Sequence, residues 1–558
     1  MAILDSSILD SSILDSSILD SSILDSSSPA ISNSTSTGES HTSAQTLPSS
    51  DLQASSAGYP EHLRNSIHRL YDEPRPSPSL WTLLKSAIGK DLTRITIPVC
   101  FNEPLSGLQR NCEEMDYDGL DIESLTRLQG RDASIARLLF VGAFAMSCYS
   151  NYSSTASRGP KPLKPFNPLL GETFEFVDRE REFRFLTEQV CHHPPVSASC
   201  CESPYYTLWS EGHVQSQFWG KHIDIHQLGT THVSLPPETG QMRCVGSERY
   251  TWKKVKLTVQ NLLVGKLSIV FNGDMVVRNW RTGDELRVTM KPTQVSGWLN
   301  DRTGPLRGAS SGALSGAVYS SDGQKLWTIE GDTTQEIRAH PCSRFGFPSS
   351  FSSATTSSSS MSVSASASWR PLVHQAAPRP LTIWRQRNST ADRSPANFYF
   401  TPFGISLNDL PGELGEFLPP TDSRLRSDQR AMEIGDWDLA EHEKTRLEQC
   451  QRQNRKRLIS DYEQYGASWW IPRWFVRDWD PLTREEYWRL TGEYWEHRRQ
   501  REWPAWVACT PSLLPRDQDM LRSNGTTSSD SINGGWTGAG ESQRGGGWAV
   551  GLDRWKAR

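Results

Sequence analysis

The segment TEQVCHHPPVS, Thr187–Ser197, places a cysteine, two histidines and two prolines in a row. Such side chains can bind a metal, pair a nucleophile with its base, or present two imidazoles to an anion. The prolines fix the backbone and remove two N–H donors, so His192 and His193 should lie at a rigid strand end. There they could donate hydrogen bonds to an anion, whose charge would favour their protonation, although a histidine pair can also be purely structural.

Neither a catalytic pair nor a metal is favoured in this segment. Successive residues of a strand point to opposite faces, so Cys191 and His192 should make poor contact. For the same reason His192 and His193 cannot share one metal without a bend. A small buried thiol is the simpler interpretation of Cys191.

The segment EKTRLEQCQR, Glu443–Arg452, is a second candidate for binding. Lys444, Glu448 and Arg452 recur every four residues and therefore share one face of a helix. This spacing fits a surface ladder of salt bridges. It also fits a phosphate clamp, in which Glu448 orients the two cations or accepts a ligand hydroxyl.

A third candidate is KPFNPLLGETFEF, Lys164–Phe176. Its two prolines should hold Lys164 and Asn167 in an extended turn before an apolar run. An ordinary entry into a strand explains the same pattern equally well.

Two other motifs have simpler explanations than the chemistry they suggest. GASSG, Gly308–Gly312, matches a nucleophile elbow by letter, but it lies in Gly- and Ser-rich sequence and not between a strand and a helix. His222, Asp224 and His226 would share a strand face, as some metal sites require. The isoleucines between them are typical of a half-exposed strand. We expect no catalytic residue, no metal and no cofactor.

Composition limits the remaining possibilities. Only 36% of the 558 residues are hydrophobic, which favours one large domain with disordered ends. A net charge of −5 gives no reason to expect nucleic acid. Ten cysteines without a C-x-x-C pair are typical of a reduced, intracellular protein. No signal peptide is evident, and the longest apolar run, Leu138–Met146, is too short to span a bilayer and predicts a buried helix.

Periodicity predicts helices, then a sheet, then helices. Ser79–Leu92 has apolar residues on one helix face, and residues 105–150 should continue as helices. From about Glu172 the period is two, and Tyr250–Asn279 should contain two strands joined by a hairpin at Asn272-Gly273-Asp274. Many short strands predict a large antiparallel sheet, closed into a barrel. Residues 423–460 are charged and helical in character.

Four motifs in order resemble the oxysterol-binding protein family of lipid-transfer proteins, over about residues 79–500. EQVCHHPP is similar to the family signature E-Q-V-S-H-H-P-P, with Cys191 in place of serine. KPFNPLLGE and TDSRLRSDQRAME, with the helix after it, resemble the segments before and after that signature. WTLLKSAIGKDL with IPVCFNEPLS resembles the family's lid region.

The resemblance implies an α+β fold: a large antiparallel near-complete β-barrel enclosing a lipid tunnel, with an N-terminal lid and a C-terminal helical part. The expected boundaries are 1–78, disordered with five ILDSS repeats; 79–96, lid; 97–160, helical; 161–422, barrel with a disordered Ser-rich insertion at 342–372; 423–510, helical; and 511–558, disordered tail. The lid residues would be Leu80, Trp81, Leu84 and Ile88.

The resemblance also implies a function. The chain would be a non-enzymatic carrier that binds one sterol or one phosphatidylinositol 4-phosphate (PI4P) and exchanges them between membranes. The inositol head group would be gripped by Lys164, Asn167, His192, His193, Lys444, Glu448 and Arg452. Alternatives are exchange of phosphatidylserine, a lipid sensor or scaffold, and a lipid-modifying enzyme.

The expected setting is a monomer in the cytosol that attaches peripherally to anionic membranes, at contacts of the endoplasmic reticulum with the plasma membrane or Golgi. No pleckstrin-homology domain, ankyrin repeat or two-Phe docking motif is evident. Trp469, Trp470, Trp474 and Arg455–Arg457 could dock an anionic leaflet. Packing of the tryptophans on the barrel exterior is the simpler alternative.

Overall fold

The computed structural model describes residues 97–116, 131–150, 164–178, 181–235, 248–260, 268–291, 312–342, 380–386, 400–410, 414–433, 435–465 and 470–504. The chain separates into two units between Thr46 and Leu47, and every described residue lies in the second. The expected lid residues Leu80, Trp81, Leu84 and Ile88 lie outside the described residues. So do the ILDSS repeats, the C-terminal tail and nearly all of the Ser-rich insertion.

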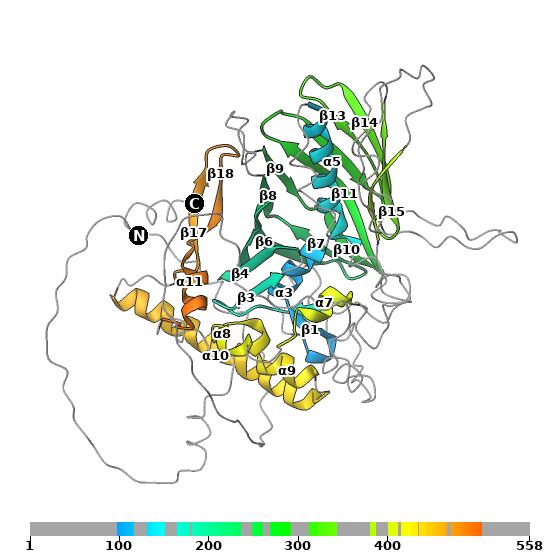
Figure 1. Ribbon diagram of the computed structural model, residues 1–558. Coiled ribbons are helices and arrows are strands. Elements are labelled where there is room, and N and C mark those ends of the chain that lie inside the picture. Colours follow the sequence, from blue (N-terminus) through cyan, green and yellow to red (C-terminus); the bar gives the residue numbers. More distant parts are fainter. Residues whose placement is uncertain are drawn as a thin grey trace, which may run out of the picture. The chain divides into compact units, whose positions relative to one another are not determined.

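One 14-stranded sheet dominates the described part of the chain (Figure 1). Its path runs β16-β15-β14-β13-β12-β11-β10-β7-β6-β5-β4-β3, while β8 pairs with β6 and β9, and β9 also pairs with β11. The strands are β3 Thr173–Asp178, β4 Phe183–His192, β5 Pro195–Glu202, β6 Thr207–Phe218, β7 Ile223–Gln227, β8 Thr230–Leu235, β9 Glu248–Lys253, β10 Lys256–Gln260, β11 Ser268–Asn279, β12 Glu285–Met290, β13 Ala313–Tyr319, β14 Lys325–Asp332, β15 Glu336–Pro341 and β16 Leu381–Arg385. The predicted large antiparallel sheet is confirmed.

The predicted hairpin at Asn272-Gly273-Asp274 is wrong, because β11 runs through it without a turn. Up to Asn272 the strand pairs with β10, and from Gly273 it pairs with β12. A two-residue hairpin of this type needs positive φ at both central residues. Here only Gly273 has one, at 140°. The glycine therefore marks the point where a long strand changes partner.

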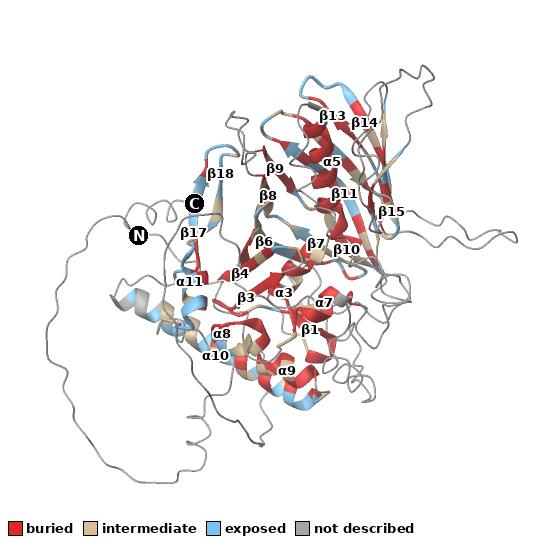
Figure 2. Cartoon of the chain, in the orientation of Figure 1, coloured by how far each residue is buried: buried red, intermediate tan, exposed pale blue. Residues whose placement is uncertain are grey.

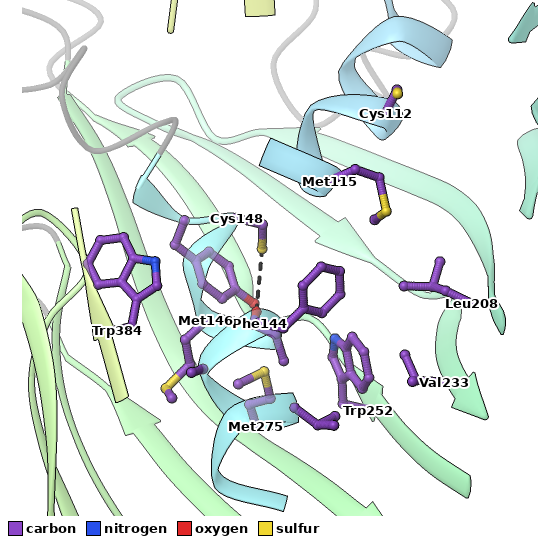
Figure 3. Packing of buried hydrophobic residues seen from close by; sticks show 14 of the residues in the cluster. Cys112, Met115, Phe144, Met146, Cys148, Leu208, Val233, Trp252, Met275 and Trp384 are labelled. Carbon is purple, nitrogen blue, oxygen red and sulfur yellow. Dashed lines mark hydrogen bonds between the residues drawn. The ribbon is translucent and has the colours of Figure 1, made fainter. Parts of the chain in front are cut away.

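Helix α5, Arg131–Ser147, packs against β9, β11, β12 and β16. Its residues are buried on every side from Ala133 onward, as expected for a helix that is apolar all round. Phe144 meets Trp252 of β9 edge to face at 6.0 Å. Figure 3 shows this contact beside Met275 of β11, with Trp384 of β16 on the other side of the helix. The buried helix predicted from the apolar run is confirmed.

The part expected to be helical, residues 97–160, also contains a strand among its described residues. Strand β1, Asn102–Ser106, pairs in parallel with β2, Lys164–Phe166. The short helix α3, Gly107–Cys112, follows, and its first turn is closed by a capping box between Ser106 and Gln109. Short 3-10 turns lie on either side, at Val99–Phe101 (η5) and Glu113–Asp116 (η6).

The C-terminal part contains the helices predicted from residue 423. They are η8 Ser423–Leu425, α9 Ser427–Glu433 and α10 Trp437–Tyr465, preceded by α7 Pro402–Ser406 and α8 Leu414–Phe417. The Trp-rich segment forms a hairpin, β17 Phe475–Asp480 and β18 Glu485–Leu490, followed by α11 Glu493–Gln500.

The Trp-rich segment packs onto one face of the sheet. Trp474 and Trp495 join Leu186 of β4 and Val196 of β5 in a second apolar cluster, separate from the one around α5. Trp474 is only 1% exposed. Much of the hairpin formed by β17 and β18 is, by contrast, exposed (Figure 2). For Trp474 the simpler alternative, packing against the sheet, is therefore the correct one.

Candidate head-group site

The seven expected head-group residues come from three elements. Lys164 lies in β2, with Asn167 just after it; His192 ends β4, with His193 in the following turn; Lys444, Glu448 and Arg452 lie on α10. We call these seven residues the collar. Gln451 of α10 joins the three elements, because its side chain bonds both the backbone N–H of Leu170, after β2, and the ring of His192.

The cationic part of the collar is built around Glu448. Lys444 Nζ donates to Glu448 at 2.7 Å, and Arg452 lies 3.7 Å from the same carboxylate. Lys444 is only 6% exposed, whereas Arg452 is half-exposed. A surface ladder of salt bridges would leave both cations in water, so the burial of Lys444 favours the clamp.

Lys164 approaches the same place from β2. Its Nζ donates to Asn167 Oδ1 at 2.6 Å. Burial and the positive charge of Lys444 lower the pKa of Lys164 to about 8, while Glu448 acts in the opposite direction. These electrostatic effects are strong only at short range, so the structure brings Lys164, Lys444 and Glu448 together.

The two histidines form one wall of the collar. Their ring centroids are 4.6 Å apart, and the His193–Pro194 peptide bond is cis. Burial, followed by the charges of His193, Arg455 and Lys164, lowers the pKa of His192 to about 3. His192 is therefore neutral at pH 7 and acts through hydrogen bonds, while His193 is exposed.

A buried ion network holds the collar from below. Arg426 makes two bonds to Asp428 and one to Glu172, and also donates to the backbone oxygen of Asn167. Burial lowers the pKa of Arg426, but the carboxylates of Asp428 and Glu172 outweigh it, so the pKa stays above its ordinary value. The network thereby ties the turn that carries Asn167 to α9.

Glu188 gives the signature a second, structural role. Its buried carboxylate accepts the backbone N–H groups of Arg473 at 2.7 Å and Trp474 at 2.9 Å. Burial raises the pKa of Glu188 to about 7 in spite of these bonds. Nearby, Trp470 Nε1 donates to the backbone oxygen of Val190 at 3.2 Å. The Trp-rich segment is therefore fixed beside the histidine pair.

The roles of Gln451, Arg426 and Glu188 are not evident in the sequence. Each depends on partners far away in the chain, and spacing carries no signal of that kind. A buried charged residue inside a motif is the one general hint, because such a charge needs a partner.

The metal alternative at His222, Asp224 and His226 finds no support. Asp224 is already bonded to Lys256 at 3.1 Å and Thr258 at 2.7 Å. His222 and Asp224 line an open concavity of about 390 Å³ together with Lys256 and Thr258, whereas His226 is not among its lining residues. Among the described residues no group of three or more His, Cys, Asp or Glu side chains could hold a metal ion.

Two further expectations concern the thiol and the membrane. Cys191 is half-buried, and burial raises the pKa of its thiol, as expected for a packing residue. Within the described ranges, no helix combines the length and apolar character needed to cross a bilayer.

Comparison with known proteins identifies relatives of this chain. The family model for oxysterol-binding protein matches residues 79–499. Oxysterol-binding protein homolog 2 of Saccharomyces cerevisiae is 38% identical over 452 residues, which cover 81% of this chain and 32% of that protein. Oxysterol-binding protein-related protein 7 of Homo sapiens is 32% identical over 428 residues, which cover 76% of this chain and 42% of that protein. The chain thus spans about a third of the length of the yeast relative.

Solved structures point to the same family as the sequence comparisons. The Osh1 ORD domain in complex with cholesterol superposes with a TM-score of 0.61 at 34% identity, covering 77% of this chain and 90% of that one. The Osh3 ORD of Saccharomyces cerevisiae in complex with PI(4)P gives a TM-score of 0.55 at 28% identity, covering 77% of this chain and 95% of that one. The sheet, the histidine pair and α10 all fall inside the matched family region, so the chain belongs to the oxysterol-binding protein family.

Proposed function

We propose that this protein is a lipid carrier that holds one sterol or one PI4P molecule and exchanges them between membranes. The observation that carries the proposal is the collar, in which Lys164 and Lys444 meet from distant parts of the chain. Three solved structures of two related domains support the choice of ligands: the Osh1 ORD domain holds cholesterol in one and ergosterol in another, and the Osh3 ORD holds PI(4)P.

The collar has the chemistry that a phosphorylated inositol requires. A phosphate monoester carries a charge of about −1.5 to −2 at pH 7. Lys164, Lys444 and Arg452 can donate charge-assisted hydrogen bonds to it, which are about twice as strong as neutral ones. Glu448 orients the cations and can accept an inositol hydroxyl, while Asn167 and His192 contribute neutral polar groups.

Exchange follows from the energetics of the hydrocarbon part. The transfer of a sterol from water into an apolar tunnel is favourable by roughly 10 kcal/mol, at about 25 cal/mol per Å² of apolar surface that it buries. A bilayer is equally apolar, so net extraction changes the free energy little, and the lipid remains exchangeable. Two lipids that share one tunnel compete, and the membrane richer in one of them displaces the other by mass action. Leu80, Trp81, Leu84 and Ile88 would form the lid over that tunnel.

The docking face for the membrane is proposed to lie beside the histidine pair. Trp470 is held there by Val190, and the next residue, Ile471, is 51% exposed. Lys456 and Arg457 of α10 are exposed and cationic. This arrangement suits peripheral attachment to an anionic leaflet. We place the protein in the cytosol, at contacts of the endoplasmic reticulum with the plasma membrane or Golgi, and assign it no catalysis.

The test is lipid transfer between liposomes by the purified protein. Lys444→Ala and the double change His192→Ala, His193→Ala should abolish extraction of PI4P and leave sterol extraction in place. Lys325→Ala, at an exposed lysine that begins β14, is the matched control for the loss of one charge. Unaltered PI4P extraction by both collar variants would contradict the assignment. Binding with a single turnover of transfer would favour a sensor, and chemically altered lipid an enzyme.

A further inference from the structure

The side chain of Gln451 can be oriented without ambiguity. It is only 8% exposed, and it makes one hydrogen bond with each end of its amide. The backbone N–H of Leu170 can only donate, so the atom it meets at 2.7 Å is the amide oxygen. The amide nitrogen therefore faces His192 Nε2, also at 2.7 Å.

This orientation fixes the proton of His192. An amide NH₂ group can only donate, so His192 Nε2 must accept, and a nitrogen that accepts carries no proton. The single proton of the neutral ring then lies on Nδ1. The lowered pKa of His192 agrees with a neutral ring.

The Nδ1 atom has an environment that suits an anion. It is buried, and no residue in the described part of the chain meets it at hydrogen-bond geometry. His193, Arg455 of α10 and Lys164 of β2 act on the ring as positive charges, while the backbone carbonyl of Pro168, a hydrogen-bond acceptor close to the ring, acts in the opposite direction and raises the pKa. A buried donor among cations is satisfied best by an anionic oxygen.

We propose that Gln451 is a positioning residue that holds the proton of His192 on Nδ1, so that the neutral imidazole donates a hydrogen bond to a phosphate oxygen of the lipid head group. The role of the phosphate rests on the proposed function; the tautomer does not. A carboxylate at position 451 would draw the proton to Nε2 and turn the lone pair of Nδ1 toward the anion.

The first experiment observes the tautomer directly. Nitrogen NMR of ¹⁵N-histidine-labelled full-length protein separates protonated from unprotonated ring nitrogens, and His192→Asn identifies the His192 signals. In the wild type, Nδ1 of His192 should be protonated and Nε2 unprotonated. Gln451→Glu keeps the acceptor for Leu170 and should protonate Nε2. Gln453→Glu places the same charge on an exposed position of the same helix and should leave His192 unchanged. An unprotonated Nδ1 in wild-type His192 would overturn the proposal.

The second experiment measures binding of vesicles that contain PI4P, against vesicles that contain phosphatidylinositol. Gln451→Glu should bind PI4P about ten- to a hundredfold more weakly at pH 8, because a lone pair replaces a donor. It should regain affinity at lower pH, where the imidazole is doubly protonated and Nδ1 donates again. Wild type and Gln453→Glu should show no such gain of PI4P affinity at lower pH.

Substitutions of His192 give an independent readout that does not alter α10. The amide nitrogen of Asn can occupy the position of Nδ1, whereas that of Gln reaches the position of Nε2. His192→Asn should therefore retain more PI4P affinity than His192→Gln, and the reverse order would overturn the proposal. If wild type shows the expected tautomer but binds no PI4P, the proposed function fails, and the role of His192 fails with it.

Discussion

Lys164 of β2 and Lys444 of α10 face the same site, and the charge of Lys444 helps to lower the pKa of Lys164 to about 8. Two like charges therefore lie close together. An anion that binds there favours the protonated form of Lys164 and so raises its pKa. The proposed binding of PI4P would consequently be coupled to uptake of a proton above pH 8.

The first prediction concerns the pH dependence of this binding. Affinity for PI4P should be nearly constant from pH 7 to 8 and then fall, by at most about tenfold per pH unit, because Lys164 loses its charge in the unbound protein. The phosphate has its second pKa near about 6 and does not titrate in this range. Vesicle binding between pH 7 and 9.5 measures it. Lys164→Arg stays charged and should remove the fall; an equal fall in that variant would refute the coupling.

The second prediction concerns stability and Glu188. The pKa of this carboxyl is raised from 4.5 to about 7 in the folded protein, so between these values the folded state holds a proton that the unfolded state has lost. The free energy of unfolding should therefore decrease as pH rises from 4.5 to 7, by about 3 kcal/mol from this group. Glu188→Gln should lack that contribution in chemical denaturation at several pH values. Glu493→Gln, at an exposed position, is the control, and parallel curves for Glu188→Gln and wild type would contradict the prediction.

The third prediction concerns the network beneath the collar. Arg426→Met leaves the buried carboxylates of Glu172 and Asp428 without their cation, which should lower the free energy of unfolding by about 3–5 kcal/mol. Adding Asp428→Asn should recover part of the loss, because one uncompensated charge disappears. Chemical denaturation of wild type, the two single variants and the double variant gives the free energies of unfolding for a double-mutant cycle. Strictly additive losses would mean that Arg426 and Asp428 do not interact.

The fourth prediction concerns the membrane. Ile471→Asp should weaken attachment to anionic vesicles by about tenfold, since an exposed apolar side chain beside the collar is replaced by a charge. Leu439→Asp introduces the same charge at an exposed leucine near the start of α10 and should have little effect. Vesicle sedimentation compares them. Equal weakening by both variants would show that Ile471 has no special place at the membrane.

Local patterns predicted much of this fold. The apolar run of α5 and the period-two segments determine their own secondary structure, because burial on all sides or on one side leaves a direct trace in sequence. The Asn-Gly pair in β11 misled the prediction, because the same two residues serve a hairpin or a strand that changes partner. Only the neighbouring strands β10 and β12 decide between them.

The collar was predictable for a different reason. Its residues lie within motifs that resemble one family, so a resemblance could group Lys164 with Lys444 where spacing could not. Gln451 and Glu188 stand inside those same motifs, yet their roles depend on which atom each side chain meets. That information exists only in three dimensions.

The central claim is that sterol and PI4P occupy one site in turn. The most direct measurement loads the protein with a fluorescent sterol, adds vesicles containing either PI4P or phosphatidylinositol, and follows sterol release together with bound lipid by native mass spectrometry. The account predicts that PI4P releases sterol one for one and that phosphatidylinositol releases far less. A species carrying both lipids at once, or PI4P uptake without sterol release, would contradict it.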